Sequence, residues 1–162
     1  MSVNRGKGFE EQVEQDLSNT GAYVLRLYDP QGGYMGVANP CDFVVCRKGC
    51  MYMLECKATH KATLSINSND PKKKYGAVSN RQWEGLLEAS RKGVVAGLLI
   101  WWVDNDVTKF VPIQTAEQLR NAGAKSLKHD ICGGGIVTIK GRKKRVFYEY
   151  DFNQFFLDLF GF

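Results

Sequence analysis

Hydrophobic positions recur along this chain at the two spacings that distinguish helices from strands. Phe9, Val13 and Leu17 follow one another at four-residue intervals, which predicts an amphipathic helix over residues 8–19. The run at 94–103 is apolar without interruption, as expected of a central strand that is covered on both faces. The two patterns together predict a fold that mixes helices with a sheet.

Residues 42–57 form the most informative segment. Two apolar runs flank Arg47-Lys48-Gly49, which is typical of a tight turn, so the segment is predicted to be a β-hairpin. Further strands are predicted at residues 23–28 and 107–113, further helices at 79–92, 116–121 and 151–160, a polar segment at 58–79, and a loop or edge hairpin at 131–146. The order predicts an α/β fold, a mixed β-sheet flanked by helices, in a single domain over residues 1–162.

The composition fits an ordinary globular protein. Of the 162 residues, 44% are hydrophobic and 24% are charged, and no apolar run approaches the ~18 residues of a membrane span. The N-terminus lacks the apolar core of a secretory signal, so a cytoplasmic protein without a membrane partner is expected. Trp101 and Trp102 are adjacent in the apolar run and are expected on opposite faces of the sheet, one of them a candidate for a subunit contact.

The five cysteines argue against disulfides and structural zinc. Their number is odd and no C-x-x-C pair occurs, and neither of the two histidines lies at ligand spacing from them. They are predicted to be small, buried, reduced thiols. The set is Cys41, Cys46, Cys50, Cys56 and Cys132.

The net charge of +5 is clustered. Lysines fill residues 72–74, and Arg142-Lys143-Lys144-Arg145 follows a glycine near the C-terminus. Such blocks bind polyanions by replacing the counterions condensed around phosphates. For either block alone, a solvated basic loop is the preferred interpretation. Two blocks in a chain that also carries an acidic hairpin favour nucleic acid as the partner.

The hairpin carries the candidate chemistry. Side chains alternate along a strand, so Glu55 and Lys57 project to one face while Cys56 points to the other. Asp42, at the start of the paired strand, brings a second carboxylate. Two carboxylates suffice for Mg²⁺, which keeps several waters, and the lysine can polarise a phosphate or the attacking water. The alternative is a surface salt bridge between Glu55 and Lys57.

At this point the chain resembles a known group of enzymes. Asp-(x12)-Glu-x-Lys on a hairpin after a helix resembles the PD-(D/E)xK nuclease superfamily, with Pro40-Cys41-Asp42 in the place of its first half. Residues 4–10, Asn-Arg-Gly-Lys-Gly-Phe-Glu, are similar to the N-R-G-x-x-x-E opening of RecU-type and archaeal Holliday junction resolvases. Residues 78–82 resemble the segment of these families that ends in an active-site glutamine. The resemblance spans residues 4–103 and implies a restriction-endonuclease-like fold.

The resemblance also implies roles for single residues. Glu10 would join Asp42 and Glu55 at the metal, although Glu14 lies one turn further along the same edge of the helix. Catalysis would involve Glu10, Asp42, Glu55, Lys57 and Gln82. DNA contacts are expected from basic residues near these motifs and in the two blocks, namely Arg5, Lys7, Lys72, Lys73, Lys74, Arg81, Arg142, Lys143, Lys144 and Arg145.

The implied function is resolution of branched DNA. It would be a Mg²⁺-dependent endodeoxyribonuclease, with Mn²⁺ as an alternative metal and no small-molecule cofactor, that cuts four-way junctions. Paired incisions require two active sites, so a homodimer is expected. Only residues 29–41 replace the long stalk of RecU-type proteins, which favours a compact archaeal-like or phage-like enzyme and a bacterial or phage source. A restriction-type or repair endonuclease, or a non-catalytic DNA-binding protein, stays open as an alternative.

Overall fold

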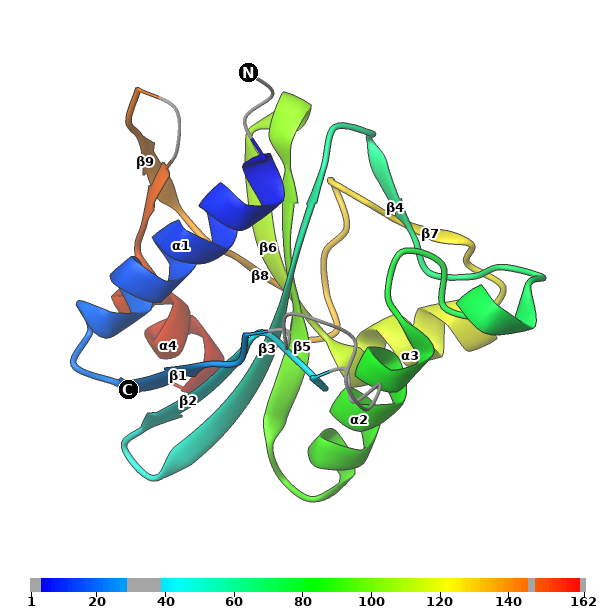
Figure 1. The fold of residues 1–162 in the computed structure, drawn as a ribbon, viewed down its shortest axis with the longest axis horizontal. Coiled ribbons are helices and arrows are strands. Elements are labelled where there is room, and N and C mark those ends of the chain that lie inside the picture. The colour runs from blue at the N-terminus through cyan, green and yellow to red at the C-terminus, as the bar shows by residue number, and fades with distance from the viewer. Residues whose placement is uncertain (1–3, 29–38, 146–147, 161–162) are drawn as a thin grey trace.

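The architecture is a mixed sheet with helices on both faces (Figure 1). The structure, a computed structural model, describes residues 4–28, 39–145 and 148–160. The helices are α1 (Arg5–Ser18), α2 (Asn80–Arg91), α3 (Ile113–Asn121) and α4 (Phe152–Phe160), with the 3-10 helices η1 (Pro71–Lys73) and η2 (Val103–Asn105). The strands are β1 (Tyr23–Arg26), β2 (Phe43–Arg47), β3 (Cys50–Thr59), β4 (Thr63–Ser65), β5 (Val95–Trp102), β6 (Val107–Pro112), β7 (Ser126–Lys128), β8 (Val137–Thr138), β9 (Gly141–Lys143) and β10 (Tyr148–Tyr150).

The main sheet has six strands in the order β1-β2-β3-β5-β6-β8. The β3–β5 pair is parallel and its neighbours are antiparallel, so the sheet is mixed. The crossover from β3 to β5 passes through β4, η1 and α2. Two small antiparallel ribbons, β4–β7 and β9–β10, complete the strands. The expected α/β class with a mixed sheet flanked by helices is confirmed.

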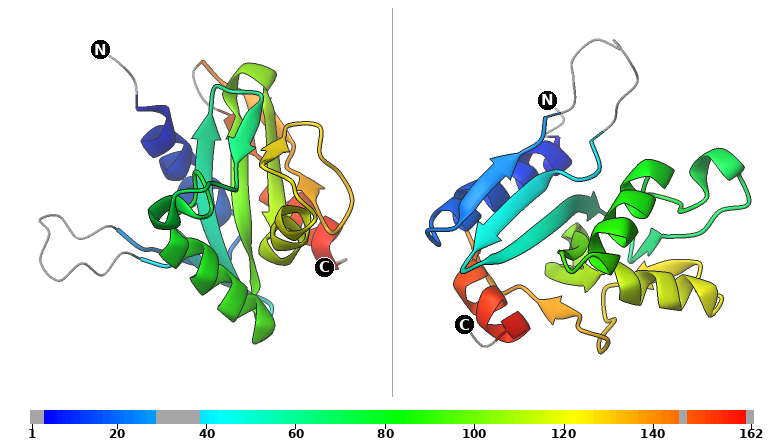
Figure 2. Two further views of the ribbon diagram at one scale, coloured as in Figure 1. Left: turned by 90° about the vertical axis from the view of Figure 1, so that its right-hand side faces the viewer. Right: turned by 90° about the horizontal axis from the view of Figure 1, so that it is seen from below.

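Each face of the sheet has its own hydrophobic core. On one face α1 and α4 pack against it, with Phe9 and Phe155 buried, and on the other α2 and α3 do so, with Trp83 buried (Figures 1 and 2). Strand alternation distributes the residues of β5 between the two cores. Trp101 belongs to the first and Trp102 to the second, and both are at most 2% exposed. The opposite-face prediction is confirmed, and burial of both rings rules out a subunit contact through either.

Local sequence explains the two elements that frame the site. Lys48 and Gly49 have φ of 48° and 78°, the left-handed conformations of a two-residue hairpin turn, so β2 and β3 pair as the predicted hairpin, with Arg47 opposite Cys50. Ser79 caps α2 through a reciprocal capping box with Gln82, as its N-cap position predicts. The hairpin and the start of α2 are therefore both fixed by short-range interactions.

Several boundaries differ from the expectation. Helix α1 begins at Arg5 because Asn4 caps it, three residues before the predicted start. Helix α3 starts at Ile113, three residues before the predicted start at 116, and the Thr115 hydroxyl within it donates to the Gly134 carbonyl. The segment 58–79, for which only a polar composition was noted, contains β4 and η1. Of residues 29–41, which were expected to replace the stalk, residues 29–38 lie outside the described residues.

The cysteine expectation holds in part. All five cysteines are free, as expected of reduced thiols, and Cys41 and Cys56 are buried. Cys46 and Cys132 are exposed, because they lie beside the hairpin turn and in the loop before β8. Within the described ranges, no helix has both the length and the apolar character that crossing a bilayer requires.

Asp16 ties the C-terminal ribbon to α1. Its carboxylate is 5% exposed and accepts hydrogen bonds from the backbone N–H of Tyr150 at 2.8 Å and from the Gln12 amide at 2.9 Å. A buried carboxylate is tolerated here because both of its oxygens have donors. The contact links the two ends of the chain across the first core.

Asp16→Ala should lower the free energy of unfolding by about 1–3 kcal/mol, since it leaves a buried backbone N–H without an acceptor. Urea unfolding followed by tryptophan fluorescence measures the change. Glu11→Ala removes an exposed carboxylate from the same helix and should cost less than about 0.5 kcal/mol. Equal losses in the two variants would contradict the structural role of Asp16.

Candidate active site

The hairpin brings the three predicted catalytic residues of residues 42–57 together. Asp42 precedes β2, and its backbone N–H donates to the Leu54 carbonyl, so it stays paired with β3. Glu55 and Lys57 project from β3 toward α2, whereas Cys56 faces the opposite core. The alternation predicted from the sequence is confirmed.

Glu55 is the centre of the site. Its side chain is 2% exposed, and its Oε1 lies 2.8 Å from Lys57 Nζ and accepts a hydrogen bond from Gln82 Nε2 at 2.7 Å. Its Oε2 is buried and has no hydrogen-bond partner among the described residues. The Glu55–Lys57 ion pair therefore exists, but it is not a surface salt bridge, because the Glu55 side chain is buried.

The protonation of Glu55 reflects this burial. Desolvation raises the pKa of the Glu55 carboxyl to about 8, against the lowering effect of Lys57, and the charge of Asp42 raises it further. A carboxyl in this state binds a proton near neutral pH. A divalent cation would displace that proton, since metal ligands must be deprotonated.

Asp42 lies at the point where β2 and β3 diverge. Its Oδ2 accepts a hydrogen bond from the backbone N–H of Cys56 at 2.7 Å. This bond fixes the Asp42 carboxylate beside Cys56. Burial raises the pKa of the Cys56 thiol, and the charges of Asp42 and Glu55 raise it further. The two acids are thus close enough to interact electrostatically.

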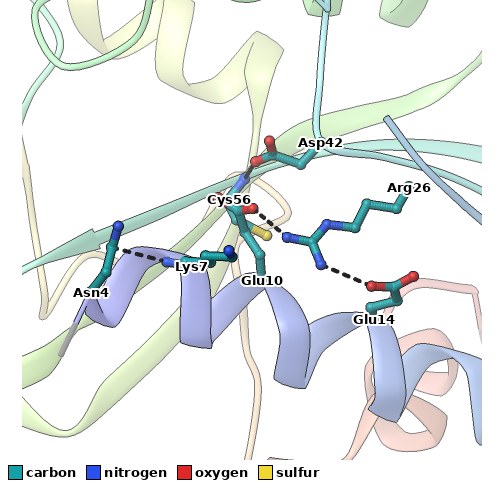
Figure 3. Close-up of polar contacts among 7 residues, drawn as sticks. All are labelled: Asn4, Lys7, Glu10, Glu14, Arg26, Asp42 and Cys56. Atoms are coloured by element: carbon teal, nitrogen blue, oxygen red, sulfur yellow. Dashed lines mark hydrogen bonds and ion pairs between the residues drawn. The ribbon is translucent and has the colours of Figure 1, made fainter. Parts of the chain in front are cut away.

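Glu10 approaches the same place from α1, although an arginine holds it (Figure 3). Its Oε2 lies 2.9 Å from Arg26 Nη2, and Glu14 lies 2.9 Å from Arg26 Nη1. Burial raises the pKa of Glu10, and the charge of Asp42 raises it too, against Arg26 and Lys57. Glu10 is therefore within electrostatic reach of the hairpin acids, while Glu14 is paired farther along the helix.

The donor set fits a divalent cation of the magnesium type. Mg²⁺ needs only one or two carboxylates and keeps several waters, so Asp42 and the unpartnered Oε2 of Glu55 satisfy its requirement. Throughout the described ranges, no three His, Cys, Asp or Glu side chains lie close enough to form a complete metal cluster. In this arrangement Glu10 is turned to Arg26 and would have to leave it to become a third ligand.

Arg26 is the residue that sequence reasoning missed. Its side chain is 9% exposed and its guanidinium bridges two carboxylates of α1, with the rings of Tyr28 and Phe43 nearby. An arginine in the last position of a short strand gave one available signal, because a buried strand position rarely tolerates an unpaired charge. Its partners could not be read from the sequence, since they lie 12 and 16 residues away on another element.

The predicted DNA-binding residues fall into three groups. Arg5, Lys7 and Arg81 are exposed in the first turns of α1 and α2. The lysines at 72–74 are exposed in and beside η1. All four residues of the C-terminal block are exposed, but three of them form ion pairs. Glu149 lies 2.9 Å from Arg142 and 3.2 Å from Lys144, and Asp106 lies 3.9 Å from Lys143.

His60 and Asp104 form a pair that contacts none of the predicted catalytic residues. His60 lies 2.8 Å from Asp104, with both side chains more than half exposed. The exposure of this pair argues against a catalytic role for either residue. Gln82 has a structural contact and a contact with the site. Its Oε1 accepts a hydrogen bond from the backbone N–H of Ser79 in the capping box, and its Nε2 donates to Glu55.

Comparison with known proteins identifies the family. The sequence model of the archaeal Holliday junction resolvase family (Hjc) matches residues 1–131. The chain therefore belongs to the archaeal Holliday junction resolvase family, which are junction-cleaving endonucleases. The predicted family and enzyme class are confirmed. The family name points to archaea rather than to the bacterial or phage source that the sequence suggested.

A solved structure of this family is also similar. It is the 1.6 Å structure of Archaeoglobus fulgidus Hjc, a Holliday junction resolvase from an archaeal hyperthermophile, with 20% sequence identity and a TM-score of 0.47 over 67% of this chain and 78% of that chain. No curated protein matches the sequence.

The raised pKa of Glu55 predicts how the free energy of unfolding changes with pH when a chelator keeps the protein free of metal. Between pH 4.5 and about 8 the folded state holds a proton that the unfolded state has lost. The free energy of unfolding should therefore fall as the pH rises through this window, by at most about 1.4 kcal/mol per pH unit, and Glu10 adds to the same trend.

Urea unfolding at several pH values between 5.5 and 8.5 measures this slope. Glu55→Gln should flatten it, because the amide does not titrate, whereas Glu11→Gln at an exposed position should leave it unchanged. A wild-type slope that Glu55→Gln fails to reduce would show that Glu55 is ionised throughout the range.

Proposed function

We propose that this chain cleaves four-way DNA junctions by metal-dependent phosphodiester hydrolysis at Asp42, Glu55 and Lys57, with Glu10 and Gln82 beside them. The carrying observation is the orphaned Oε2 of Glu55, a buried oxygen next to a second carboxylate and a lysine. Buried oxygens without donors are rare in folded proteins, and a cation supplies the missing partner. Family membership supports a four-way junction as the substrate.

Asp42 and Glu55 would hold Mg²⁺ or Mn²⁺, with Glu10 as the third carboxylate. A bound ion of this kind supplies a water of lowered pKa and stabilises the charge that develops on the phosphate. Glu10 is shared between this role and its ion pair with Arg26. Arg26 keeps the second carboxylate of α1, that of Glu14, away from the site.

Lys57 and Gln82 would position the reacting groups. The Lys57 side chain is 22% exposed, so its ammonium can donate to a phosphate oxygen while it stays beside Glu55. Gln82 donates to Oε1 of Glu55 and so holds one oxygen of the carboxylate, while the buried Oε2 has no donor among the described residues. The capping box in turn holds Gln82, which makes the start of α2 part of the site.

The DNA backbone would pass over the two helix N-termini near the site. Arg5 and Lys7 at the start of α1 and Arg81 at the start of α2 are exposed there. Helix N-termini favour phosphate through their free N–H groups and dipole. Contacts of this kind read the backbone and not the bases, which suits recognition by junction shape.

Asp42→Asn and Glu55→Gln should each abolish junction cleavage in Mg²⁺, with rates lowered at least about a thousandfold. Binding to a four-way junction should persist or tighten, because each change removes a negative charge near phosphate. Cleavage of labelled junctions in single-turnover conditions and gel-shift titration in EDTA measure the two effects. Near-normal cleavage by either variant would refute the assignment.

A second copy of the chain would bind through an apolar face of the hairpin region. Tyr23, Cys46 and Met51 lie side by side across β1, β2 and β3, and Leu25, Val44 and Met53 form the next row. Tyr23, Leu25 and Met51 are 65%, 43% and 42% exposed. Contiguous exposed apolar side chains mark interaction surfaces in soluble proteins.

The position of this face suits the task. The row after Leu25, Val44 and Met53 contains Asp42 and Glu55, two residues farther along β2 and β3 in opposite directions. A two-fold axis through the apolar face would therefore relate two active sites that lie at its border. Paired incision of a junction requires two sites in such a fixed relation.

Leu25→Glu combined with Met51→Glu should convert a dimer to a monomer, because two buried charges at an interface cannot be solvated. Analytical ultracentrifugation measures the association. Leu157→Glu, on the exposed side of α4 at 46% exposure, is the matched control and should leave the dimer intact. Dissociation by the control alone would place the interface on α4 instead.

A further inference from the structure

The excess positive charge of this chain is concentrated in one structural unit that the sequence divides. We define the basic lobe as residues 61–77 and 124–129, which contain six lysines and one aspartate, a net charge of +5. The whole chain has 22 basic and 17 acidic residues, so the remainder holds sixteen of each and is neutral. The lobe therefore accounts for the entire net charge.

Folding brings the two segments together. Strand β4 pairs with β7 in register, with Thr63 opposite Lys128 and Ser65 opposite Ser126, although the strands are about sixty residues apart in the sequence. The pairing adds Lys125 and Lys128 to Lys61 and the lysines at 72–74. In Figure 1 the ribbon lies on the side of the sheet that α2 and α3 cover, away from β9.

The lobe is held firmly despite its polar composition. Leu64, Ile66 and Leu127 are buried in the second core. The Tyr75 ring stacks on Trp83 with centroids 4.8 Å apart, and the Arg120 guanidinium lies 4.6 Å from the same ring. These contacts fix the backbone that carries the lysines, so their charges are presented from a rigid base.

The lysines themselves are available. All six, Lys61, Lys72, Lys73, Lys74, Lys125 and Lys128, are exposed, and none forms an ion pair with another residue of the described ranges. The one acid of the lobe, Asp70, caps η1 through the backbone N–H of Lys72. The C-terminal block differs, because Glu149 and Asp106 pair with three of its four cations.

The lobe borders the active site on two sides. Along β3, the residues on the face of Glu55 and Lys57 continue through Thr59 toward Lys61, at most ~20 Å from Glu55. Through α2, Gln82 contacts Glu55 while Asn80 donates to the Pro71 carbonyl of η1. A duplex with its backbone at Glu55 would reach the lobe after roughly half of its ~34 Å turn.

We propose that the basic lobe binds the phosphate backbone of a duplex arm of the junction and supplies most of the electrostatic affinity. The inference rests on the proposed junction cleavage and names where the substrate is held. A duplex is favoured over a single strand because the lobe exposes no large aromatic side chain on which bases could stack. Lys61, Lys125 and Lys128 are the members of this surface that the sequence patterns did not assign to DNA contact.

Three triple variants test the proposal by DNA binding in EDTA, where no cleavage occurs; two of them remove three positive charges each and the third removes none. Lys61→Gln, Lys125→Gln and Lys128→Gln are combined in the lobe variant, and Arg142→Gln, Lys143→Gln and Lys144→Gln in the control. Lys61→Arg, Lys125→Arg and Lys128→Arg keep the lobe charged. Fluorescence anisotropy with a four-way junction, a linear duplex and a single strand, at several salt concentrations, measures affinity and its salt slope.

The lobe variant should bind junction and duplex at least about tenfold more weakly, and its salt slope should fall by about 2–3, as expected for the loss of three phosphate contacts. The control should change the slope by less than about 1, and the arginine variant should bind like the wild type. Equal effects of the lobe and control variants would show that the lobe contributes no more to DNA affinity than other basic residues, and would overturn the proposal. Preferential loss of single-strand binding would overturn it as well.

Cleavage separates this result from the proposed function. At protein concentrations that saturate the junction, the lobe variant should cleave in Mg²⁺ at the wild-type rate, since its lysines lie outside the catalytic set. A lobe variant that stays slow at saturation would show that these lysines act in the chemistry, contrary to the proposal. Absence of cleavage by the wild type would refute the nuclease function alone, because binding is measured without metal.

Discussion

A single buried carboxylate sets the conditions for the rest of this structure. Glu55 is almost fully removed from water, and burial of a charge without partners would be prohibitive. Lys57 and Gln82 both bind its Oε1, one from the same strand and one from the first turn of α2. The hairpin register and the capping box of α2 therefore both serve one side chain. The second oxygen is left without a donor, and this is the feature that a cation would complete.

Charge is arranged around that carboxylate in a graded way. Asp42 and Glu10 lie close enough to raise its pKa, and Arg26 offsets the cost of this crowding by pairing with Glu10 and Glu14. Farther out, cations without partners are gathered in the basic lobe. An acidic centre with a basic surround attracts a polyanion while reserving the interior for a metal. Because the remainder of the chain is neutral overall, the net charge of +5 is concentrated in the region where we propose that the duplex binds.

Patterns of short range were sufficient for much of the site. The hairpin was predicted because its turn residues and alternation act over a few positions, and the face shared by Glu55 and Lys57 followed from strand geometry. The start of α2 followed from Ser79, whose capping interaction spans three residues. Elements were missed where the pattern was too short to repeat. Strands β4 and β7 have three residues each, too few to show alternation, and pair across a long separation.

The sequence by itself determined the fold class, the hairpin, the residues that carry the candidate chemistry and the presence of excess positive charge. Only the tertiary structure decided which charges are compensated. Glu149 and Asp106 neutralise most of the C-terminal block, Arg26 holds Glu10, and the β4–β7 pairing adds two lysines to the triplet. The physical reason is that an ion pair depends on distance in space. These partners belong to separate elements that strand pairing or packing brings into contact, from seven residues apart for Arg142 and Glu149 to about sixty for β4 and β7.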